Sequence, residues 1–271
     1  MQEPKKILVT GSHGYIGSHL VDLLDSLGYD TYTLDIRDEN NPVDINQHIS
    51  ASYIFDTVVH LAALVNVGES VQHPASYYQT NILGAVNIVR SIPCDNFIFA
   101  STGAAESVAS PYGISKRVAE ELISDYCGKE KIDYTIFRFY NVIGSNGYPP
   151  TNPDGLFYNL IQAESTGKFN INGTDYNTKD GTCVRDYVHV MEICHAIVQA
   201  IETPANRVEC LGHGTGWTVK EIIDVYKKVN NVDFEVVEHP RRPGDMEASV
   251  LATTSEYMKT QYTIEELLRR K

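Results

Sequence analysis

Residues 7–17 read ILVTGSHGYIG, an apolar run followed by glycines at positions 11, 14 and 17. Apolar residues then recur at helical spacing over Tyr15–Leu27, which predicts a strand, a glycine turn and a helix that begins at the turn. A second strand is expected over Thr31–Leu34, and it leads into Asp35. Such a turn lets the backbone approach a pyrophosphate, and the helix N-terminus offers it oriented N–H groups. The stretch therefore predicts a dinucleotide-binding site.

The acid after the second strand favours one form of that dinucleotide. Asp35 can accept hydrogen bonds from ribose hydroxyls and would repel a 2′-phosphate, so NAD is favoured over NADP. Two alternatives remain open. Arg37 follows two residues later and would tolerate the 2′-phosphate, and a glycine turn can also exist without any ligand.

Strand and helix patterns alternate through the first half of the chain. Strand-like runs occur at Thr57–Leu61, Phe97–Ala100 and Tyr134–Phe139, and helical patterns occur at 74–91 and 111–127. This alternation predicts an α/β fold, a doubly wound parallel sheet of the Rossmann type. The stretch 37–55 is polar and shows no clear strand or helix.

The character of the chain changes after about residue 140. Glycine, proline and asparagine cluster in 144–155, which indicates a loop, and helical patterns return at 156–164, 188–202 and 218–229. We expect an NAD-binding domain over 1–140 and a smaller, irregular α/β substrate lobe over 141–271. Some segments of that lobe are expected to pack back onto the first domain.

Charge and cysteine content exclude several classes of protein. With 22 basic and 35 acidic residues among 271, the net charge is −13, which disfavours nucleic acid as a partner. An anionic substrate would then need a local arginine cluster. Five cysteines without C-x-x-C spacing favour reduced thiols in the cytoplasm over disulfides or a metal site, and no apolar run is long enough to span a membrane.

A tyrosine and a lysine open the helix expected at 111–127. Ser110 suits the N-cap and Pro111 the first helical position, which places Tyr112 and Lys116 one turn apart on the same face. A phenol with a pKa of about 10 is a poor base at neutral pH, and a neighbouring cation favours its phenolate. Downstream of a dinucleotide turn, this pair is a candidate acid/base site. The alternative is an ordinary exposed pair on a helix surface.

These motifs together resemble the extended short-chain dehydrogenase/reductases, and in particular the UDP-glucose 4-epimerases. The resemblance runs from about residue 6 to residue 250. It is carried by the glycine turn and the Tyr112/Lys116 pair, and by the segments 59–63, 67–71, 74–81, 96–102, 180–190 and 240–245.

The resemblance implies roles for individual residues. Thr102, Tyr112 and Lys116 would be catalytic, and no metal is implied. NAD would be bound by Gly11, Gly14, Tyr15, Ile16, Gly17, Asp35, Ile36, Asp44, Ile45, Leu61, Ala62, Ala63, Asn81, Tyr112, Lys116 and Tyr140. The UDP-sugar would be bound by Thr102, Asn141, Asn159, Leu160, Arg185, Arg242, Asp245 and Ser249, of which the two arginines would form the local positive cluster.

The resemblance also implies a reaction and an assembly. Tyr112 would deprotonate the sugar 4-hydroxyl while NAD takes the C4 hydride, and the hydride would return to the other face of the 4-keto sugar. A homodimer through the helices that begin near Pro74 and Pro111 is expected, with Val118, Leu122 and Tyr126 in an exposed apolar stripe on the second helix. The alternative is that these three residues face the sheet of their own subunit. The small Ser249 implies that N-acetylated UDP-hexoses are accepted besides UDP-glucose and UDP-galactose.

Several departures from the family and three rival functions accompany this resemblance. The chain is short, its crossover after Asp35 is reduced, the loop after Thr102 is short, and Val65 replaces a frequent lysine. Rivals within the fold are a 4,6-dehydratase or another nucleotide-sugar epimerase. Gly103-Ala104 stand where a dehydratase has an Asp-Glu pair. The non-enzymatic alternative is a regulator that binds NAD and catalyses no reaction.

Overall fold

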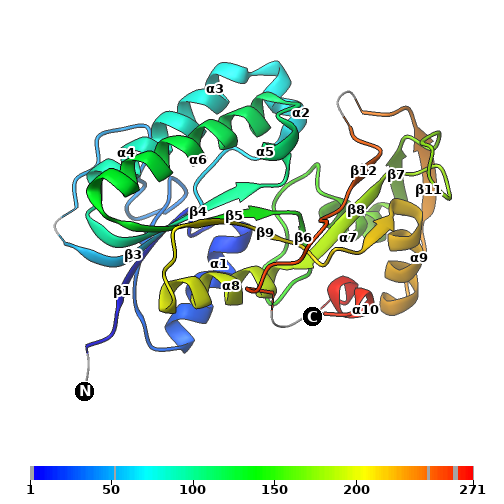
Figure 1. The fold of residues 1–271 in the computed structure, drawn as a ribbon. Coiled ribbons are helices and arrows are strands. Elements are labelled where there is room, and N and C mark those ends of the chain that lie inside the picture. The colour runs from blue at the N-terminus through cyan, green and yellow to red at the C-terminus, as the bar shows by residue number, and fades with distance from the viewer. Residues whose placement is uncertain (1–2, 52, 243–244, 259–261, 271) are drawn as a thin grey trace. The chain divides into compact units, whose positions relative to one another are not determined.

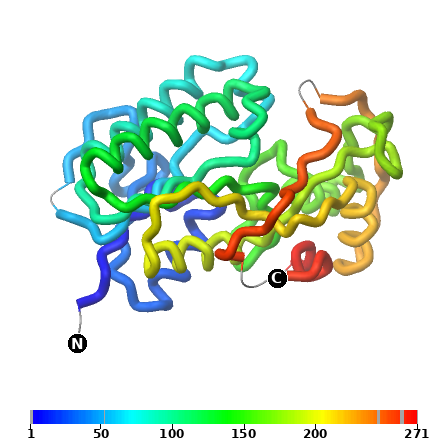
Figure 2. The backbone as a smooth tube through the Cα atoms, in the orientation of Figure 1, coloured from blue at the N-terminus to red at the C-terminus, as the bar shows by residue number. Residues whose placement is uncertain are grey.

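The computed structural model describes residues 3–51, 53–242, 245–258 and 262–270. The chain divides into two compact units. Unit 1 comprises residues 1–139 and 194–209, and unit 2 comprises 140–193 and 210–271. Figure 2 shows the chain leaving unit 1 in green and returning to it in yellow.

Unit 1 is built on a six-stranded sheet in the order β2-β1-β3-β4-β5-β9. Its strands are β1 (Lys6–Thr10), β2 (Asp30–Leu34), β3 (Phe55–His60), β4 (Cys94–Thr102), β5 (Asp133–Phe139) and β9 (Arg207–Leu211). The ladders that join β1 through β5 are all parallel. This arrangement confirms the prediction of a doubly wound α/β fold.

Helices cover both faces of this sheet. They are α1 (Tyr15–Ser26), α2 (Val67–Gln72), α3 (Pro74–Tyr78), the π-helical η1 (Gln79–Gly84), α4 (Ala85–Ser91), α5 (Ala104–Ser107), α6 (Pro111–Glu130) and α8 (Val190–Glu202). Figure 1 shows α3, α4 and α6 on one side of the sheet and α1 and α8 on the other. Among the described residues, no helix combines the length and apolar character needed to cross a membrane.

Buried apolar strands explain why this sheet lies at the centre of unit 1. Val58 and Val59 in β3 are fully buried on successive positions, so both faces of that strand are covered. On the helix side, Leu20 and Leu24 of α1 are one turn apart and also fully buried. The second half of α6 contributes Ile123 to the core that lies between the helices and the sheet.

The strand order determines where a ligand can bind. The chain goes from β1 to β2 on one side and then crosses to β3 on the other, so the order reverses between β1 and β3. In open α/β sheets, ligands bind at the carboxyl ends of the strands beside such a reversal. The glycine turn follows β1, and residues 61–63 follow β3, so both predicted segments lie at this edge.

Unit 2 holds short strands around its own core. Its elements are β6 (Asn141–Ile143), α7 (Leu156–Thr166), β7 (Lys168–Asn172), β8 (Val184–His189), β10 (Gly216–Thr218), α9 (Val219–Asn230), β11 (Glu235–His239), β12 (Ala248–Ser249) and α10 (Ile264–Leu268). Strand β8 lies between β10 and β12 and also pairs with β6, whereas β7 and β11 form a separate parallel pair. Phe157, Leu160 and Tyr226 are fully buried in this core.

Two predicted helices differ from the observed ones. The helix expected over 188–202 begins at Val190, because Val188 and His189 complete β8 in register with β6. The helix expected over 74–91 is interrupted by the π-helical turn η1 between α3 and α4. Apolar periodicity alone distinguishes neither a buried strand end from a helix start nor an α-helix from a π-turn.

Candidate active site

The glycine turn after β1 packs too closely for side chains at Gly11 and Gly17. Gly11 has φ +70°, and a Cβ there would lie 2.7 Å from the backbone nitrogen of Ala62, which follows β3. Cβ atoms on Gly14 and Gly17 would lie 3.0 and 2.1 Å from the Gly11 carbonyl oxygen. No side chain caps α1 at Gly14, so the N-terminal end of α1, where Tyr15 and Ile16 lie, faces the turn without a capping group. This geometry fits the approach of a phosphate.

Asp35 lies buried beside the turn and ties it to β2. Its carboxylate accepts the backbone N–H groups of His13 and Arg37, each at 2.8 Å. Burial by itself raises the pKa of the Asp35 carboxyl, but these N–H donors and the Arg37 guanidinium, 3.4 Å away, outweigh it and lower the pKa. A Cβ on Gly14 would lie 3.4 Å from Arg37 Nη2, so the arginine lies beside the turn.

Other residues predicted to contact the cofactor have clear structural partners. The Asn81 side chain accepts from Leu64 N at 2.9 Å and donates to Leu64 O at 2.9 Å and to Ser115 Oγ at 3.0 Å. It therefore joins η1, α6 and the segment after β3. Ile45 is a core residue packed against Gly84, and Asp44 accepts from Asn46 N at 2.9 Å.

The remaining predicted cofactor residues differ in exposure and position. Ile36 is 62% exposed after β2, whereas Leu61, Ala62 and Ala63 follow β3 and are partly buried. Tyr140 lies in unit 2, where its N–H donates to Leu211 O at 3.0 Å.

The three predicted catalytic residues come together in unit 1. Thr102 is the last residue of β4, and Tyr112 and Lys116 lie one turn apart at the start of α6. Burial raises the pKa of Tyr112 to about 12, while a hydrogen bond with the Thr102 hydroxyl lowers it. Ser110 caps α6, accepting from Gly113 N at 3.2 Å, as the sequence predicted.

Lys116 is almost fully buried. Its Nζ lies 4.2 Å from the centre of the Phe99 ring in β4. Burial lowers the pKa of its ammonium to about 7, and the carboxylate of Glu120 opposes that shift. A buried ammonium and a phenol on one helix face can exchange protons with a bound hydroxyl, which is the arrangement that acid/base chemistry needs.

In unit 2, two of the predicted substrate residues pair with each other. Arg185 in β8 forms a salt bridge with Asp245 and donates to its neighbour's carbonyl, Val184 O, at 2.8 Å. Ser249 in β12 is the register partner of Arg185 in a parallel ladder, and side chains in register point to the same face of a sheet. These three residues therefore form one group.

A second group in unit 2 contains Arg242. Its guanidinium donates to Asp154 O at 3.3 Å. With its amide turned so that oxygen faces the arginine, Asn172 accepts from two guanidinium nitrogens at 3.1 Å each. Asn159 donates to Pro153 O at 2.7 Å and to Gly155 O at 2.8 Å.

Sequence reasoning missed Asn172. It precedes Gly173, whose φ of +78° forms a turn. Its carboxamide beside Arg242 makes it a candidate binding residue. The remaining two residues predicted to bind the substrate have structural roles. Leu160 is fully buried, and Asn141 donates to Asp186 O at 3.0 Å.

No cluster of three or more metal-binding side chains occurs among the described residues. All five cysteines belong to that part of the chain and are free thiols, four of them buried.

Comparison with known proteins agrees with this geometry. Residues 7–210 match the family model described as the NAD dependent epimerase/dehydratase family. UDP-glucose 4-epimerase 4 of Oryza sativa subsp. japonica is 32% identical over 330 aligned positions, covering 98% of this chain and 88% of the rice protein. UDP-glucose 4-epimerase of Rhizobium meliloti (strain 1021) is 32% identical over 287 positions, covering 88% of this chain and 86% of that protein.

Two solved structures are similar over nearly the whole chain. The UDP-glucose 4-epimerase from Bifidobacterium longum in complex with NAD+ and UDP has a TM-score of 0.88 at 26% identity, covering 97% of this chain and 96% of that one. The UDP-Glc/GlcNAc 4-epimerase from Campylobacter jejuni has a TM-score of 0.79 at 27% identity, covering 97% of each chain. The family model and the rice relative extend over most of the sequence, and the chain therefore belongs to the NAD-dependent epimerase/dehydratase family.

Proposed function

We propose that this chain is an NAD-dependent 4-epimerase of UDP-linked hexoses, acting on UDP-glucose and UDP-galactose. The observation that carries the proposal is the hydrogen-bonded Thr102–Tyr112 hydroxyl pair beside buried Lys116. The pair lies in the same unit as the glycine turn. The named relatives are UDP-glucose 4-epimerases, one of them solved with NAD+ and UDP.

The residues present fit NAD. The turn has no room for side chains at Gly11 and Gly17, a Cβ on Gly14 would lie 3.0 Å from Gly11 O, and the N-terminus of α1 carries no side-chain cap. A pyrophosphate would take the backbone N–H groups there, and Asp35 would take the adenine-ribose hydroxyls. When bound, NAD supplies the hydride acceptor and donor at sugar C4.

The chain's own residues manage the proton. Tyr112 would remove the proton from the 4-hydroxyl, and Thr102 would hold the reacting oxygen through its hydroxyl. At a pKa of about 12 the phenol would stay protonated at neutral pH, so a nearby cation is required to favour the phenolate. Lys116 provides that charge from the next turn of α6. The same Tyr112 would return the proton when the sugar has turned over.

The candidate substrate groups of unit 2 would hold the nucleotide. Arg185 and Arg242 are the positive charges that a diphosphate requires in a chain of net charge −13. Asp245 keeps Arg185 in place, and Asn172 does so for Arg242. Holding the UDP part leaves the hexose free to present either face. We accordingly propose that unit 1 is the NAD-binding part and unit 2 the substrate-binding part.

Two rivals are disfavoured by particular residues. A 4,6-dehydratase needs an acid and a base after the catalytic threonine, whereas Gly103 and Ala104 follow Thr102 here. The next carboxylate, Glu106, is paired with Arg138 at 3.3 Å. A regulator that binds NAD without catalysis would have no use for a buried lysine beside a phenol.

The test is direct. The purified protein should show bound NAD by absorbance and should convert UDP-galactose into UDP-glucose. Tyr112→Phe should lower turnover by at least about 100-fold, which is the usual contribution of a general base. Tyr126→Phe is the matched control, since it makes the same change on the same helix at a residue that packs against the core. Near-normal turnover of the Tyr112→Phe protein would contradict the assignment.

We further propose that N-acetylated UDP-hexoses are accepted. Ser249 shares a sheet face with Arg185 and is much smaller than tyrosine, so it leaves room beside the sugar. The similar Campylobacter jejuni enzyme is named for both Glc and GlcNAc forms. Ser249→Tyr should lower kcat/KM for the acetylated pair and spare the plain pair. Ala248→Tyr, on the other face of β12, is the control, and equal losses with both substrate pairs would reject the idea.

A homodimer in the cytoplasm is the proposed form of the enzyme, with neither a membrane nor a nucleic acid as partner. Leu83 and Leu122 are 63% and 42% exposed on η1 and α6, and Tyr78 and Ile114 are exposed on α3 and α6. Tyr126, by contrast, packs against the core of its own unit, and Val118 is partly buried. Sedimentation of wild type should give a dimer that Leu122→Glu weakens, while Leu27→Glu, at an exposed site just after α1, leaves it intact.

A further inference from the structure

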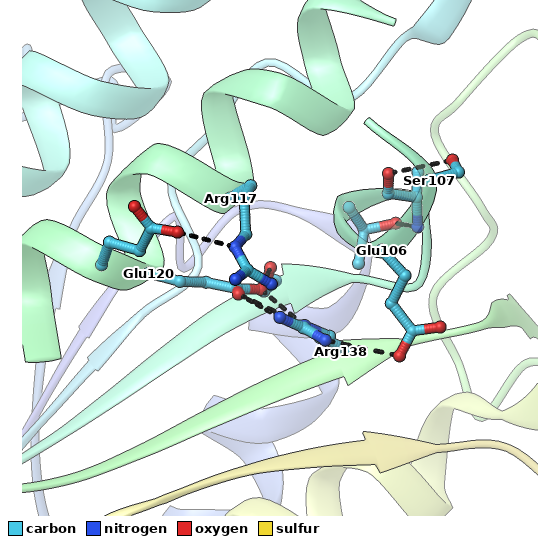
Figure 3. A network of polar contacts seen from close by, with 9 residues as sticks. Glu106, Ser107, Arg117, Glu120 and Arg138 are labelled. Carbon is cyan, nitrogen blue, oxygen red and sulfur yellow. Dashed lines mark hydrogen bonds and ion pairs between the residues drawn. The ribbon is translucent and has the colours of Figure 1, made fainter. Parts of the chain in front are cut away.

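A buried carboxylate on α6 is bonded from two strands of the sheet (Figure 3). Glu120 lies one turn after Lys116 and is only 3% exposed. Arg138 in β5 donates to it through Nε at 2.9 and 3.2 Å and through Nη2 at 2.6 Å. The Ser101 hydroxyl, next to Thr102 in β4, donates to it as well. Glu120 therefore joins the helix that carries the acid/base pair to the strand that carries the threonine.

The charges in this cluster balance only when Lys116 is included. Arg138 has two carboxylate partners, Glu120 and Glu106, so these three groups carry a net charge of −1. The Lys116 ammonium brings the sum to zero. A buried cation without such compensation would lose its proton because burial disfavours its charged form.

Among the described residues, no other charged group favours the charged form of Lys116. His60 from β3 is buried, and burial lowers the pKa of its imidazole to about 3, so it is neutral. Phe99 from β4 offers only its ring face, and Tyr112 on α6 is a neutral phenol. Glu120 is the carboxylate that opposes the loss of the lysine proton.

We infer that Glu120 is a positioning residue that keeps Lys116 charged for its task beside Tyr112. Arg138 and Ser101 hold the carboxylate at a fixed place. The inference rests on the proposed epimerase function for the meaning of the charge, although the charge itself can be measured without any reaction.

Glu120→Gln tests the inference, and Glu121→Gln is the matched control. Glu121 is the next residue of α6, but it is 64% exposed and pairs with Arg117 at 2.9 Å on the surface. In protein labelled with carbon-13 lysine, the Lys116 side-chain signal is followed against pH and assigned by its absence in Lys116→Met. Wild type should titrate near pH 7. Glu120→Gln should titrate about one pH unit lower or more, and Glu121→Gln should match wild type.

Arg138→Met separates charge from structural support. It removes the cation and leaves Glu120 negative, so the Lys116 titration should move to higher pH, opposite to Glu120→Gln. Damage to the fold alone would not reverse the sign. Unchanged Lys116 titration in Glu120→Gln, or the same direction in both variants, would overturn the inference.

The pH dependence of kcat should shift in the same direction as the Lys116 titration. Since Lys116 must be charged, the high-pH limb of kcat should move to lower pH in Glu120→Gln, and Glu121→Gln should keep the wild-type profile. A wild-type protein without epimerase activity would refute the proposed function and leave the titration test of Glu120 standing.

Discussion

Alanine substitutions at four glycines should separate crowding from backbone strain in the turn after β1. Gly17 has an ordinary φ, but its Cβ would lie 2.1 Å from Gly11 O and 2.8 Å from Ser12 Cα. Gly28, after α1, has φ +82° and nothing within 4 Å of a Cβ. Gly11 combines both problems, with φ +70° and a Cβ 2.7 Å from Ala62 N. Gly14 has neither a positive φ nor a contact below 3.0 Å.

The expected costs follow from these geometries. Gly28→Ala should cost only the left-handed penalty of about 1–2 kcal/mol. Gly17→Ala should cost about 3 kcal/mol or more, because the atoms in its way are backbone and no rotamer change can relieve them. Gly11→Ala should exceed Gly28→Ala by a similar margin. Gly14→Ala should cost less than about 1 kcal/mol of stability, yet weaken NAD binding, because its Cβ would occupy the space of the pyrophosphate.

Urea unfolding followed by circular dichroism gives the stability order, and fluorescence titration gives NAD affinity. A midpoint for Gly14→Ala below that of Gly17→Ala would refute the reasoning, because the close contacts would then not govern the turn. Equal NAD affinities for wild type and Gly14→Ala would refute the assignment of this turn to the pyrophosphate.

Three further perturbations test single features. Its N–H donors and Arg37 lower the pKa of Asp35, so the carboxylate stabilises the fold above about pH 4. This contribution is lost as pH falls through the lowered pKa. The stability difference between wild type and Asp35→Asn, measured from urea midpoints, should therefore shrink below about pH 4. Val108 has φ +45° and is 45% exposed, so Val108→Gly should raise stability by about 0.5–1 kcal/mol in thermal unfolding. Thr218 and Glu221 form a capping box at α9, so Thr218→Ala should cost about 1 kcal/mol, measured by urea unfolding against Thr218→Ser.

Local signals explain how much of unit 1 was predictable. Strands β1, β3, β4 and β5 each contain a buried apolar run, and the chain alternates between strand and helix. Much of unit 2 gave no such signal. Strands β7 and β11 are five residues long with mixed polarity, and β12 has only two residues, so their pairing depends on partners distant in sequence. The helix at 67–72 was also missed because it is short and half polar.

In the candidate site too, residues that form local motifs were predictable and residues paired over long distances in sequence were not. The glycine turn, Asp35 and the Tyr112/Lys116 pair are read from spacings of a few residues. Glu120 on α6 is paired with Arg138 on β5, 18 residues away, and Arg185 with Asp245, 60 residues away. Nothing in the local sequence distinguishes these side chains from surface charges. Only the family resemblance pointed to Arg185 and Asp245, and it did not point to Asn172.

The short connection after Asp35 contains no helix and is held in place by other contacts. Among residues 36–51, which the structure describes, no helix or strand occurs. Hydrogen bonds and the apolar side chains of Val43, Ile45, Ile49 and Ala51 hold the segment to the core instead. The Asp35 carbonyl accepts from Val43 N at 3.0 Å, and the Asn87 side chain in α4 donates to Ile45 O at 2.8 Å and to Gln47 O. Each of these hydrogen bonds contributes only about 0.5–1.5 kcal/mol, so together with these few apolar contacts they stabilise the segment less than a full buried helix face would. This segment borders Asp35 on the adenosine side of the proposed NAD site, whereas Thr102, Tyr112 and Lys116 lie on β4 and α6. Shortening of the chain should therefore affect how tightly NAD is retained before it affects the chemistry.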